Sequence, residues 1–342
     1  MNKRVGILTG GGDCPGLNAV IRGAVRRALR SGWECVGILE GWRGLIDAKY
    51  MPLDLEAIRG ILPRGGTILR TSRTNPSKRP EGMNLIRQNY NALGLDSLIA
   101  IGGDDTQGVA SKLHEAGLKV IGVPKTIDND LSGTDCTFGF DTAVNIVTEA
   151  IDRLHTTAEA HNRVMVVEVM GRHAGWIAVA SGIAGGADVV LIPEKPINLD
   201  EVVKLLQHRV ERGRTFSIMV VAEGAKFADG VQVTLSSKID EFGHEQQGGI
   251  GTVLAAEIEK RTGLETRAVI LGHVQRGGSP SAFDRILATR FGVIAMEQVI
   301  KGESGKMVAL HGGDIVTVPF SEALTNRKVD PELYRVAETF FG

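Results

Sequence analysis

Two short loops bring together residue types that could bind a metal, accept a proton and hold a phosphate. One is Gly-Gly-Asp-Asp-Thr at 102–106, and the other is Pro-Lys-Thr-Ile-Asp-Asn-Asp at 124–130. Each follows a short apolar segment, at 97–101 and 120–123, whose length and apolarity predict a buried parallel strand. Ligands of open α/β sheets bind at the carboxyl ends of such strands, so we expect both loops to face one site.

Asp104 and Asp105 are neighbours in the chain, and carboxylates this close repel each other unless a cation lies beside them. Mg²⁺ is a suitable cation because it prefers oxygen ligands, keeps part of its water and bridges substrate phosphates. Asp104 could also simply cap the helix that begins near Thr106. Because the two roles are compatible, the pair predicts a magnesium site in either case.

A second pair of carboxylates flanks Asn129. Asp128 could take a proton from an attacking alcohol, and the hydroxyl of Thr126 could hold a phosphate. An Asp-Asn-Asp segment on its own is more often an ordinary turn. Lys125 precedes the loop and Asp104 is expected nearby, which favours the catalytic interpretation.

A glycine-rich turn, Gly-Gly-Gly-Asp-Cys-Pro-Gly at 10–16, links the first expected strand to the first expected helix. Backbone N–H groups in such a turn can approach a phosphate closely, and the helix N-terminus adds partial positive charge. The alternative is that glycine only turns the chain. Asp13 and Pro15 interrupt the spacing of a dinucleotide fingerprint, so the turn favours phosphate binding without a nicotinamide cofactor.

Two more expected strand ends carry arginine, in Met-Gly-Arg-His at 170–173 and His-Val-Gln-Arg-Gly-Gly-Ser-Pro at 273–280. Guanidinium groups suit phosphate better than ammonium groups because they form paired hydrogen bonds. Each arginine alone could be a solvated surface residue. Clustering at strand ends favours a clamp for a phosphorylated substrate, with Arg163, Arg172, Arg267 and Arg276 as candidates.

Strand-like and helix-like segments alternate from the start of the chain, which is typical of parallel βαβ units. The chain of 342 residues exceeds the size that one hydrophobic core usually serves, so two lobes are expected. Polar, glycine-containing sequence from Gly224 to Gly251 predicts a surface excursion. The first sheet should include strands at 5–9 and 34–39 around a helix at 15–31, and a second sheet should include segments 163–169, 189–192 and 216–222.

The composition describes a globular protein without a strong overall charge. The formal net charge of −1 gives no field that would attract nucleic acid or an anionic membrane. The three cysteines form no Cys-x-x-Cys pair and indicate reduced thiols. No segment approaches the roughly 18 apolar residues of a membrane span, and the N-terminal apolar stretch is too short for a signal peptide. These features predict a cytoplasmic protein that binds neither nucleic acid nor membrane.

Together these segments closely resemble the motifs of the phosphofructokinase family. The motifs occur in one order through nearly the whole chain, which is not expected by chance. Diacylglycerol and NAD kinases share only a loop like Gly-Gly-Asp-Gly-Thr. The matching segments are TGGGDCPGLNA at 9–19, RGGT at 64–67, IGGDDT at 101–106, PKTIDND at 124–130, VMGR at 169–172, LGHVQRGGSP at 271–280 and DRILA at 284–288.

The resemblance implies an α/β fold of two Rossmann-like three-layer lobes with mostly parallel sheets and an active site in the cleft between them. It implies a donor lobe of residues 1–138 plus about 274–325, and a fructose 6-phosphate lobe of about 139–273 plus 326–342. The implied activity is a Mg²⁺-dependent phosphoryl transfer to the 1-hydroxyl of fructose 6-phosphate, a step of glycolysis. A homodimer or homotetramer is implied because Arg163 and Arg267 would reach into a neighbouring subunit's site.

Individual roles are carried over from the family residue by residue. Asp128 is implied as the base, Asp104 as the residue that positions Mg²⁺, and Asp105 and Lys125 as further residues of the reaction. The implied donor-binding residues are Gly12, Arg73, Gly103 and Thr106. The implied substrate-binding residues are Thr126, Ile127, Asp128, Arg163, Met170, Gly171, Arg172, Glu223, Arg267, His273, Val274, Gln275 and Arg276.

Asp105 and Lys125 depart from the ATP-dependent pattern, which has glycine at both positions, and resemble the pyrophosphate-dependent branch. A carboxylate close to the α-phosphate of ATP costs about 4 kcal/mol at roughly 4 Å and an effective dielectric of about 20. This corresponds to about a thousandfold discrimination against ATP. Lys125 would neutralise charge on pyrophosphate, unless it only forms a surface salt bridge with Asp105. The alternatives are the ATP-dependent enzyme and a non-catalytic sugar-phosphate sensor.

The effector site of bacterial ATP-dependent members carries over poorly. Arg22, Arg26 and Arg214 match its basic positions, but Leu55 and His155 stand where arginines are usual. Regulation by a nucleotide or phosphoenolpyruvate is therefore not implied. The polar excursion is absent from short bacterial members, and the resemblance gives it no role.

Overall fold

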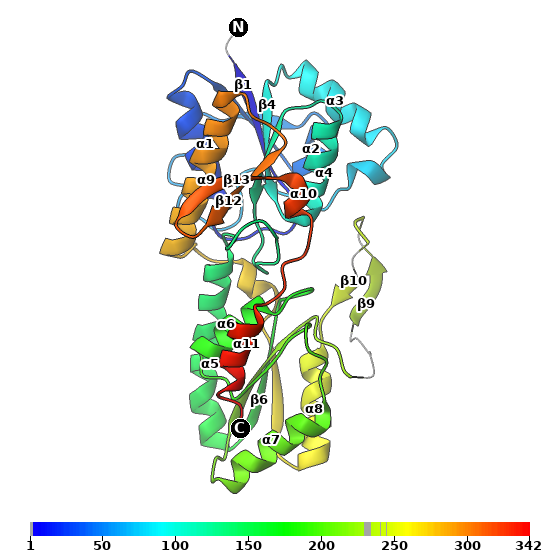
Figure 1. Ribbon diagram of the computed structural model, residues 1–342, viewed down its shortest axis with the longest axis vertical. Helices are drawn as coiled ribbons and strands as arrows, with labels where there is room; N and C mark the ends of the chain where they lie inside the picture. Colours follow the sequence, from blue (N-terminus) through cyan, green and yellow to red (C-terminus); the bar gives the residue numbers. More distant parts are fainter. Residues whose placement is uncertain (1–2, 229–233, 240, 244) are drawn as a thin grey trace.

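The computed structural model describes residues 3–228, 234–239, 241–243 and 245–342. Two α/β lobes are stacked end to end, and the chain ends in the second, lower lobe of Figure 1. Each lobe has its own main sheet. The prediction of two α/β lobes with mostly parallel sheets is confirmed.

Seven strands form the sheet of the first lobe, and the five central ones are parallel. The two outer strands are antiparallel to their neighbours. The order across the sheet is β13 (Asp314–Pro319), β12 (Lys306–His311), β5 (Val120–Pro124), β4 (Ser97–Gly102), β1 (Arg4–Thr9), β2 (Glu34–Ile38) and β3 (Tyr50–Pro52).

Helices cover both faces of this sheet, which explains why its central strands are apolar on both sides. Ile99 and Ile101 of β4 pack in the core cluster that contains α1 (Leu17–Leu29) and α9 (Ala282–Lys301). Leu98 and Ala100, which alternate with them, pack on the opposite side. The helices of that second layer are α2 (Gly41–Ile46), α3 (Gly82–Ala92), α4 (Asp104–Glu115) and α10 (Phe320–Ala323).

The second lobe has a smaller sheet of four parallel strands. Its order is β11 (Thr266–Ile270), β6 (Val164–Val169), β8 (Ser217–Ala222) and β7 (Val189–Leu191). One face packs against α5 (Phe140–His161), α6 (Trp176–Ala184) and α11 (Pro331–Glu338). The other face packs against α7 (Leu199–Glu211) and α8 (Ile250–Thr262).

The predicted strands agree with the observed ones to within one residue at each end. The first helix begins at Leu17 rather than at 15, because Gly16 has a φ of 106° and this left-handed conformation cannot continue a helix. Two short 3₁₀ helices, η1 (Pro76–Lys78) and η2 (Gly272–Arg276), lie in the loops that precede α3 and α9.

The polar excursion contains a two-stranded antiparallel hairpin of β9 (Thr234–Ile239) and β10 (Glu245–Gln247). Other parts of the predicted excursion, at 229–233, 240 and 244, lie outside the described residues. In the described part of the chain, no helix is both long enough and apolar enough to cross a bilayer. The predicted residue boundaries of the lobes stay a prediction.

Candidate active site

A cleft of about 740 Å³ opens where the two lobes meet. It is lined by residues that directly follow strands of both sheets. Gly11, Gly103 and Lys125 follow β1, β4 and β5 of the first lobe, while Met170 and Glu223 follow β6 and β8 of the second. The carboxyl ends of parallel strands therefore face the cleft from both sides, as expected for a ligand site in α/β sheets.

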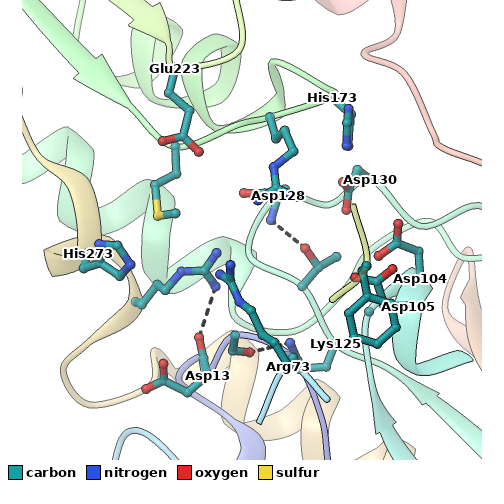
Figure 2. A pocket seen from close by; sticks show the side chains of 18 of the residues that line it. Asp13, Arg73, Asp104, Asp105, Lys125, Asp128, Asp130, His173, Glu223 and His273 are labelled. Atoms are coloured by element: carbon teal, nitrogen blue, oxygen red, sulfur yellow. Dashed lines mark hydrogen bonds between the residues drawn. The ribbon is translucent and has the colours of Figure 1, made fainter. Parts of the chain in front are cut away.

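The glycine-rich turn after β1 meets two cations. A Cβ atom on Gly12 would lie 2.6 Å from Nη1 of Arg276, so a larger residue here would push this arginine away from the turn. The same Nη1 donates to the carbonyl of Asp13 at 3.3 Å. The Nζ of Lys125 donates to the carbonyl of Gly12 at 2.5 Å, and Figure 2 shows both contacts. The turn thus lies beside positive charge from distant parts of the chain, as a phosphate site requires.

Lys125 is a buried residue, with only 3% of its surface exposed. Burial lowers its pKa and Arg276 lowers it further, whereas the carboxylates of Asp128 and Asp104 raise it. An ammonium group here is costly unless an anion lies nearby. The alternative of a surface salt bridge does not fit a lysine that is this deeply buried.

Asp104 and Asp105 form the first turn of α4, where exposed N–H groups favour negative charge. Gly103 occupies the N-cap position, so Asp104 is not the residue that caps this helix. Both aspartates line the cleft, on the same side as Lys125 in Figure 2. Thr106 is packed behind them with 2% of its surface exposed. Their position in the first turn is therefore not that of a structural cap.

The loop after β5 directs two more carboxylates into the cleft. The backbone N–H of Asp128 donates to Oγ1 of Thr126, and Asn129 has a φ of 52° and accepts from the N–H of Thr137. Oδ1 of Asp128 is buried and has no hydrogen-bond partner among the described residues. Burial, with the charges of Asp128 and Asp104, raises the pKa of Asp130 to about 7. Because Oδ1 of Asp128 has no hydrogen-bond partner among the described residues, it is available to accept a proton.

The second lobe contributes Arg172, His273 and two carboxyl groups, those of Glu168 and Glu223. Arg172 and His273 line the cleft, and Glu223 follows β8 beside them. Burial raises the pKa of Glu223 to about 7, the charge of Asp128 adds to this, and Arg172 opposes it. Figure 2 shows Glu223 and His273 across the cavity from Asp105. This half of the cleft can bind an anion while Glu223 bonds to a neutral hydroxyl.

A model of the family described as Phosphofructokinase matches residues 4–299 of the chain. The chain belongs to the phosphofructokinase family. This assignment confirms that the chain is an enzyme and a phosphotransferase, so the alternative of a non-catalytic sensor is not retained.

Full-length relatives of this phosphofructokinase differ in their phosphoryl donor. The pyrophosphate--fructose 6-phosphate 1-phosphotransferase of Streptomyces coelicolor is 58% identical over 342 residues, which cover 99% of this chain and 100% of the relative. The ATP-dependent 6-phosphofructokinase 2 of the same organism is 54% identical over 330 residues, covering 96% and 97%. The two donor types are therefore not separated by overall similarity.

The fold also matches a solved phosphofructokinase from Saccharomyces cerevisiae, with a TM-score of 0.83 and 32% sequence identity. The match covers 99% of this chain and 47% of that one, so this chain spans about half the length of the yeast chain. The agreement supports the two-lobe arrangement around the cleft.

Most of the predicted site residues line this one cleft, but several do not. Ile127 is a core residue, and Val274 is 62% exposed. Gln275 is buried and accepts from the N–H of Met170 at 3.2 Å, so it supports the loop at 170 rather than lining the cavity. Gly171 lies in the same loop, and its carbonyl accepts from the N–H of Gly224.

Arg163 and Arg267 lie far from the other candidates in the fold. They stand just before β6 and at the start of β11, so they lie at the amino ends of these strands, opposite the carboxyl ends that face the cleft. Both bind the carboxylate of Glu265, at 2.8 and 2.5 Å. They do not contribute to the cleft of their own chain.

Several lining residues were not among the predicted site residues, and Trp42, Glu168, His173 and Phe242 are examples. Trp42 follows a turn in which Glu40 and Gly41 both have positive φ, and its indole N–H has no partner among the described residues. Trp42 and His173 each lie four residues after the end of a strand, β2 and β6, and this position was a signal that the sequence offered. No sequence signal pointed to Phe242, which lies in the excursion.

A second cavity of about 320 Å³ lies in the second lobe and is lined by His155, Asp188, Arg209, Arg212, Arg214, Phe216 and Gly342. It contains His155 and Arg214, two of the positions that correspond to the bacterial effector site. Arg22, Arg26 and Leu55 are not among the residues that line it.

Proposed function

We propose that this phosphofructokinase uses pyrophosphate as its phosphoryl donor and converts fructose 6-phosphate to fructose 1,6-bisphosphate and phosphate. The observation that carries the proposal is the pair Asp105 and Lys125, which line the same side of the cleft. A carboxylate beside the donor disfavours the extra phosphate of a nucleotide, while a buried ammonium favours a small inorganic polyanion. Because pyrophosphate has a modest transfer potential, the reaction should run in both directions.

Asp128 is proposed as the general base. Its Oδ1 is buried without a hydrogen-bond partner among the described residues, so it can accept the proton of the sugar's 1-hydroxyl as that oxygen attacks. The proton then resides on Asp128 and returns to solvent. Lys125, beside the glycine-rich turn, stabilises charge on the phosphoryl group and on the departing phosphate.

Mg²⁺ is proposed to bind in the donor half together with the donor's own phosphates, because no three His, Cys, Asp or Glu side chains of the described residues are grouped so as to hold a metal ion by themselves. Asp104 and Asp105 supply carboxylate oxygens from α4, and Asp128 and Asp130 supply them from the loop after β5. Mg²⁺ typically takes one or two protein carboxylates together with water and substrate phosphates. Asp104, with one further carboxylate, would hold the ion. When bound, it would neutralise the donor's charge and align its phosphates.

Arg172, Arg276 and His273 are proposed to hold fructose 6-phosphate in the second half of the cleft, where Arg172 and Arg276 supply paired hydrogen bonds to phosphate. Arg163 and Arg267 would complete the site of a neighbouring subunit, since they lie outside their own cleft. This makes a homodimer or homotetramer part of the proposal. The proposed lobe boundaries are those stated from the sequence, and cytoplasmic location stays a prediction.

The alternative donor is ATP, which the 54%-identical ATP-dependent relative favours. The test is a coupled assay of fructose 1,6-bisphosphate formation with each donor in turn on the purified full chain. We expect kcat/KM with pyrophosphate to exceed that with ATP by about a thousandfold, because repulsion between Asp105 and the nucleotide costs about 4 kcal/mol. A higher kcat/KM with ATP would overturn the choice of donor.

A further inference from the structure

The polar excursion between β8 and α8 is attached at both of its ends to the half of the cleft proposed for the sugar. At its start, the N–H of Glu223 donates to the carbonyl of Val169, and the N–H of Gly224 to that of Gly171. At its end, the N–H groups of Gly249 and Gly251 donate to the carboxylate of Glu168, at 2.9 and 2.8 Å. Glu168 is almost fully buried. Both attachments therefore lie beside the cleft, where a bound sugar phosphate would contact them.

The tip of the same excursion contacts the other lobe. Figure 1 shows the β9–β10 hairpin projecting from the second lobe toward the first. Between these strands, the carboxylate of Glu241 accepts from the N–H of Asn75 at 2.9 Å and from Nη2 of Arg79 at 3.1 Å. Phe242 packs against the core cluster of the first lobe that contains Trp42, and it also lines the cleft. The described residues of the excursion thus contact both lobes.

The segment that Glu241 holds is the loop that carries Arg73, a lining residue of the donor half. At its beginning, this loop is fixed to the glycine-rich turn, because Thr71 Oγ1 donates to the carbonyl of Gly11 and the carbonyl of Ser72 accepts from the N–H of Gly11. At its other end, Asn75 and Arg79 are held by Glu241. Arg73 lies between these two attachments.

We propose that the excursion is a strap that couples the two substrate sites, with Glu241 as a positioning residue for the donor loop. Sugar phosphate binding fixes the ends of the strap, the strap fixes the loop, and Arg73 is then ordered for the donor phosphates. Because such coupling is reciprocal, donor binding tightens sugar phosphate binding by the same factor. The inference rests on the proposed assignment of donor and sugar to the two halves of the cleft.

A purely structural role would give a different result. Exposed ion pairs contribute little to stability, so loss of the contact between Arg79 and Glu241 by itself should leave binding unchanged. Arg4 and Glu34 provide a matched control. Their side chains are 38% and 45% exposed, against 37% and 40% for Arg79 and Glu241. They lie at the amino ends of β1 and β2, whereas the cleft is at the carboxyl ends of the strands.

The test is calorimetric titration of imidodiphosphate with Mg²⁺ into the full chain, with and without saturating fructose 6-phosphate. We expect the wild-type affinity for imidodiphosphate to rise at least about fivefold with the sugar phosphate, in the usual range of coupling. The rise should shrink in Glu241→Gln, which keeps an acceptor for Asn75 but loses the charge, and fall below about twofold in Glu241→Ala. Glu34→Gln should behave as wild type.

A wild-type ratio near one, or a Glu241→Ala ratio equal to that of wild type, would overturn the strap. Urea unfolding of each variant separates lost coupling from lost folding. Phe242→Ala, which leaves the Glu241 contacts in place, should keep most of the coupling while weakening donor binding. If the donor assay instead identifies ATP, the same titration with adenylyl imidodiphosphate still tests the strap. The failure of the donor assignment and the failure of the coupling are therefore distinguishable.

Discussion

The two halves of the cleft are built with opposite electrostatics, although each is proposed to hold a phosphate. In the donor half, carboxylates outnumber the cations Lys125 and Arg73, and Arg276 reaches this half only where it lies against the glycine-rich turn. In the sugar half, Arg172 and Arg276 face two carboxyl groups, Glu168 and Glu223, and burial raises the pKa of Glu223 to about 7, which allows it to be neutral. The donor half can therefore accept a polyanion only with an added cation, whereas the sugar half supplies its own positive charge.

The largest expected effect comes from the carboxylate between the two halves. Asp128→Asn keeps the shape of the side chain but removes the proton acceptor. We expect kcat to fall by about 10² to 10⁴, the usual contribution of a positioned base. The Kd for fructose 6-phosphate, measured by calorimetry, should change little. A variant that keeps kcat within about tenfold of wild type would contradict the role of Asp128.

Removal of divalent metal tests the difference between the halves directly. In the presence of a chelator, binding of imidodiphosphate should weaken by about 100-fold or more, because charge neutralisation by a metal is worth several kcal/mol. Binding of fructose 6-phosphate to the arginine-lined half should be almost unaffected. If titration shows that the chelator weakens the binding of both ligands equally, the two halves of the cleft do not differ in their need for an added cation.

The buried lysine is the main cation of the donor half. Lys125→Gly should lower kcat/KM for pyrophosphate by about 10² to 10³, comparable to the loss of one preorganised charge-stabilising donor. Sugar phosphate affinity should remain near wild type, since Lys125 contacts the glycine-rich turn rather than the sugar half. Steady-state kinetics with pyrophosphate varied at saturating sugar measure the effect. Loss of sugar binding instead of donor use would contradict the assignment.

A smaller effect concerns stability and pH in the sugar half. The pKa of Glu223 is raised to about 7 from 4.5, mainly by burial, so the folded chain keeps this proton where the unfolded chain loses it. The resulting stabilisation is full below pH 4.5 and is lost as the pH rises to about 7. Glu223→Gln should remove about 3 kcal/mol of this pH dependence, measured by urea unfolding at acidic and mildly alkaline pH. If the pH dependence of the unfolding free energy is unchanged in this variant, the pKa of Glu223 is not raised in the folded chain.

Much of the donor half of the cleft could be predicted from the sequence, because it is built from residues that directly follow strands. Apolar segments such as 97–101 predicted β4, and the loop after it then had to face the site. The capping role considered for Asp104 was wrong, because Gly103 takes the N-cap position. The support given by Gln275 to the backbone of Met170 could not be derived, because it depends on tertiary contact.

The excursion shows the limit of such reasoning. Glu241 and Phe242 lie in a polar stretch without strand or helix periodicity, and nothing local indicates that its tip crosses to the other lobe. Their position depends on Asn75 and Arg79, which are more than 160 residues away in the chain. Contacts between distant surface segments leave no local pattern, so only the structure could assign them to the cleft.

The central claim is that negative charge at position 105 keeps a nucleotide out of the donor half. The most direct test is the ratio of kcat/KM for pyrophosphate to kcat/KM for ATP in Asp105→Gly relative to wild type. We predict that the ratio falls by at least about tenfold, chiefly because ATP is used better once the repulsion is removed. An unchanged ratio, with ATP affinity equal to that of wild type, would contradict the account.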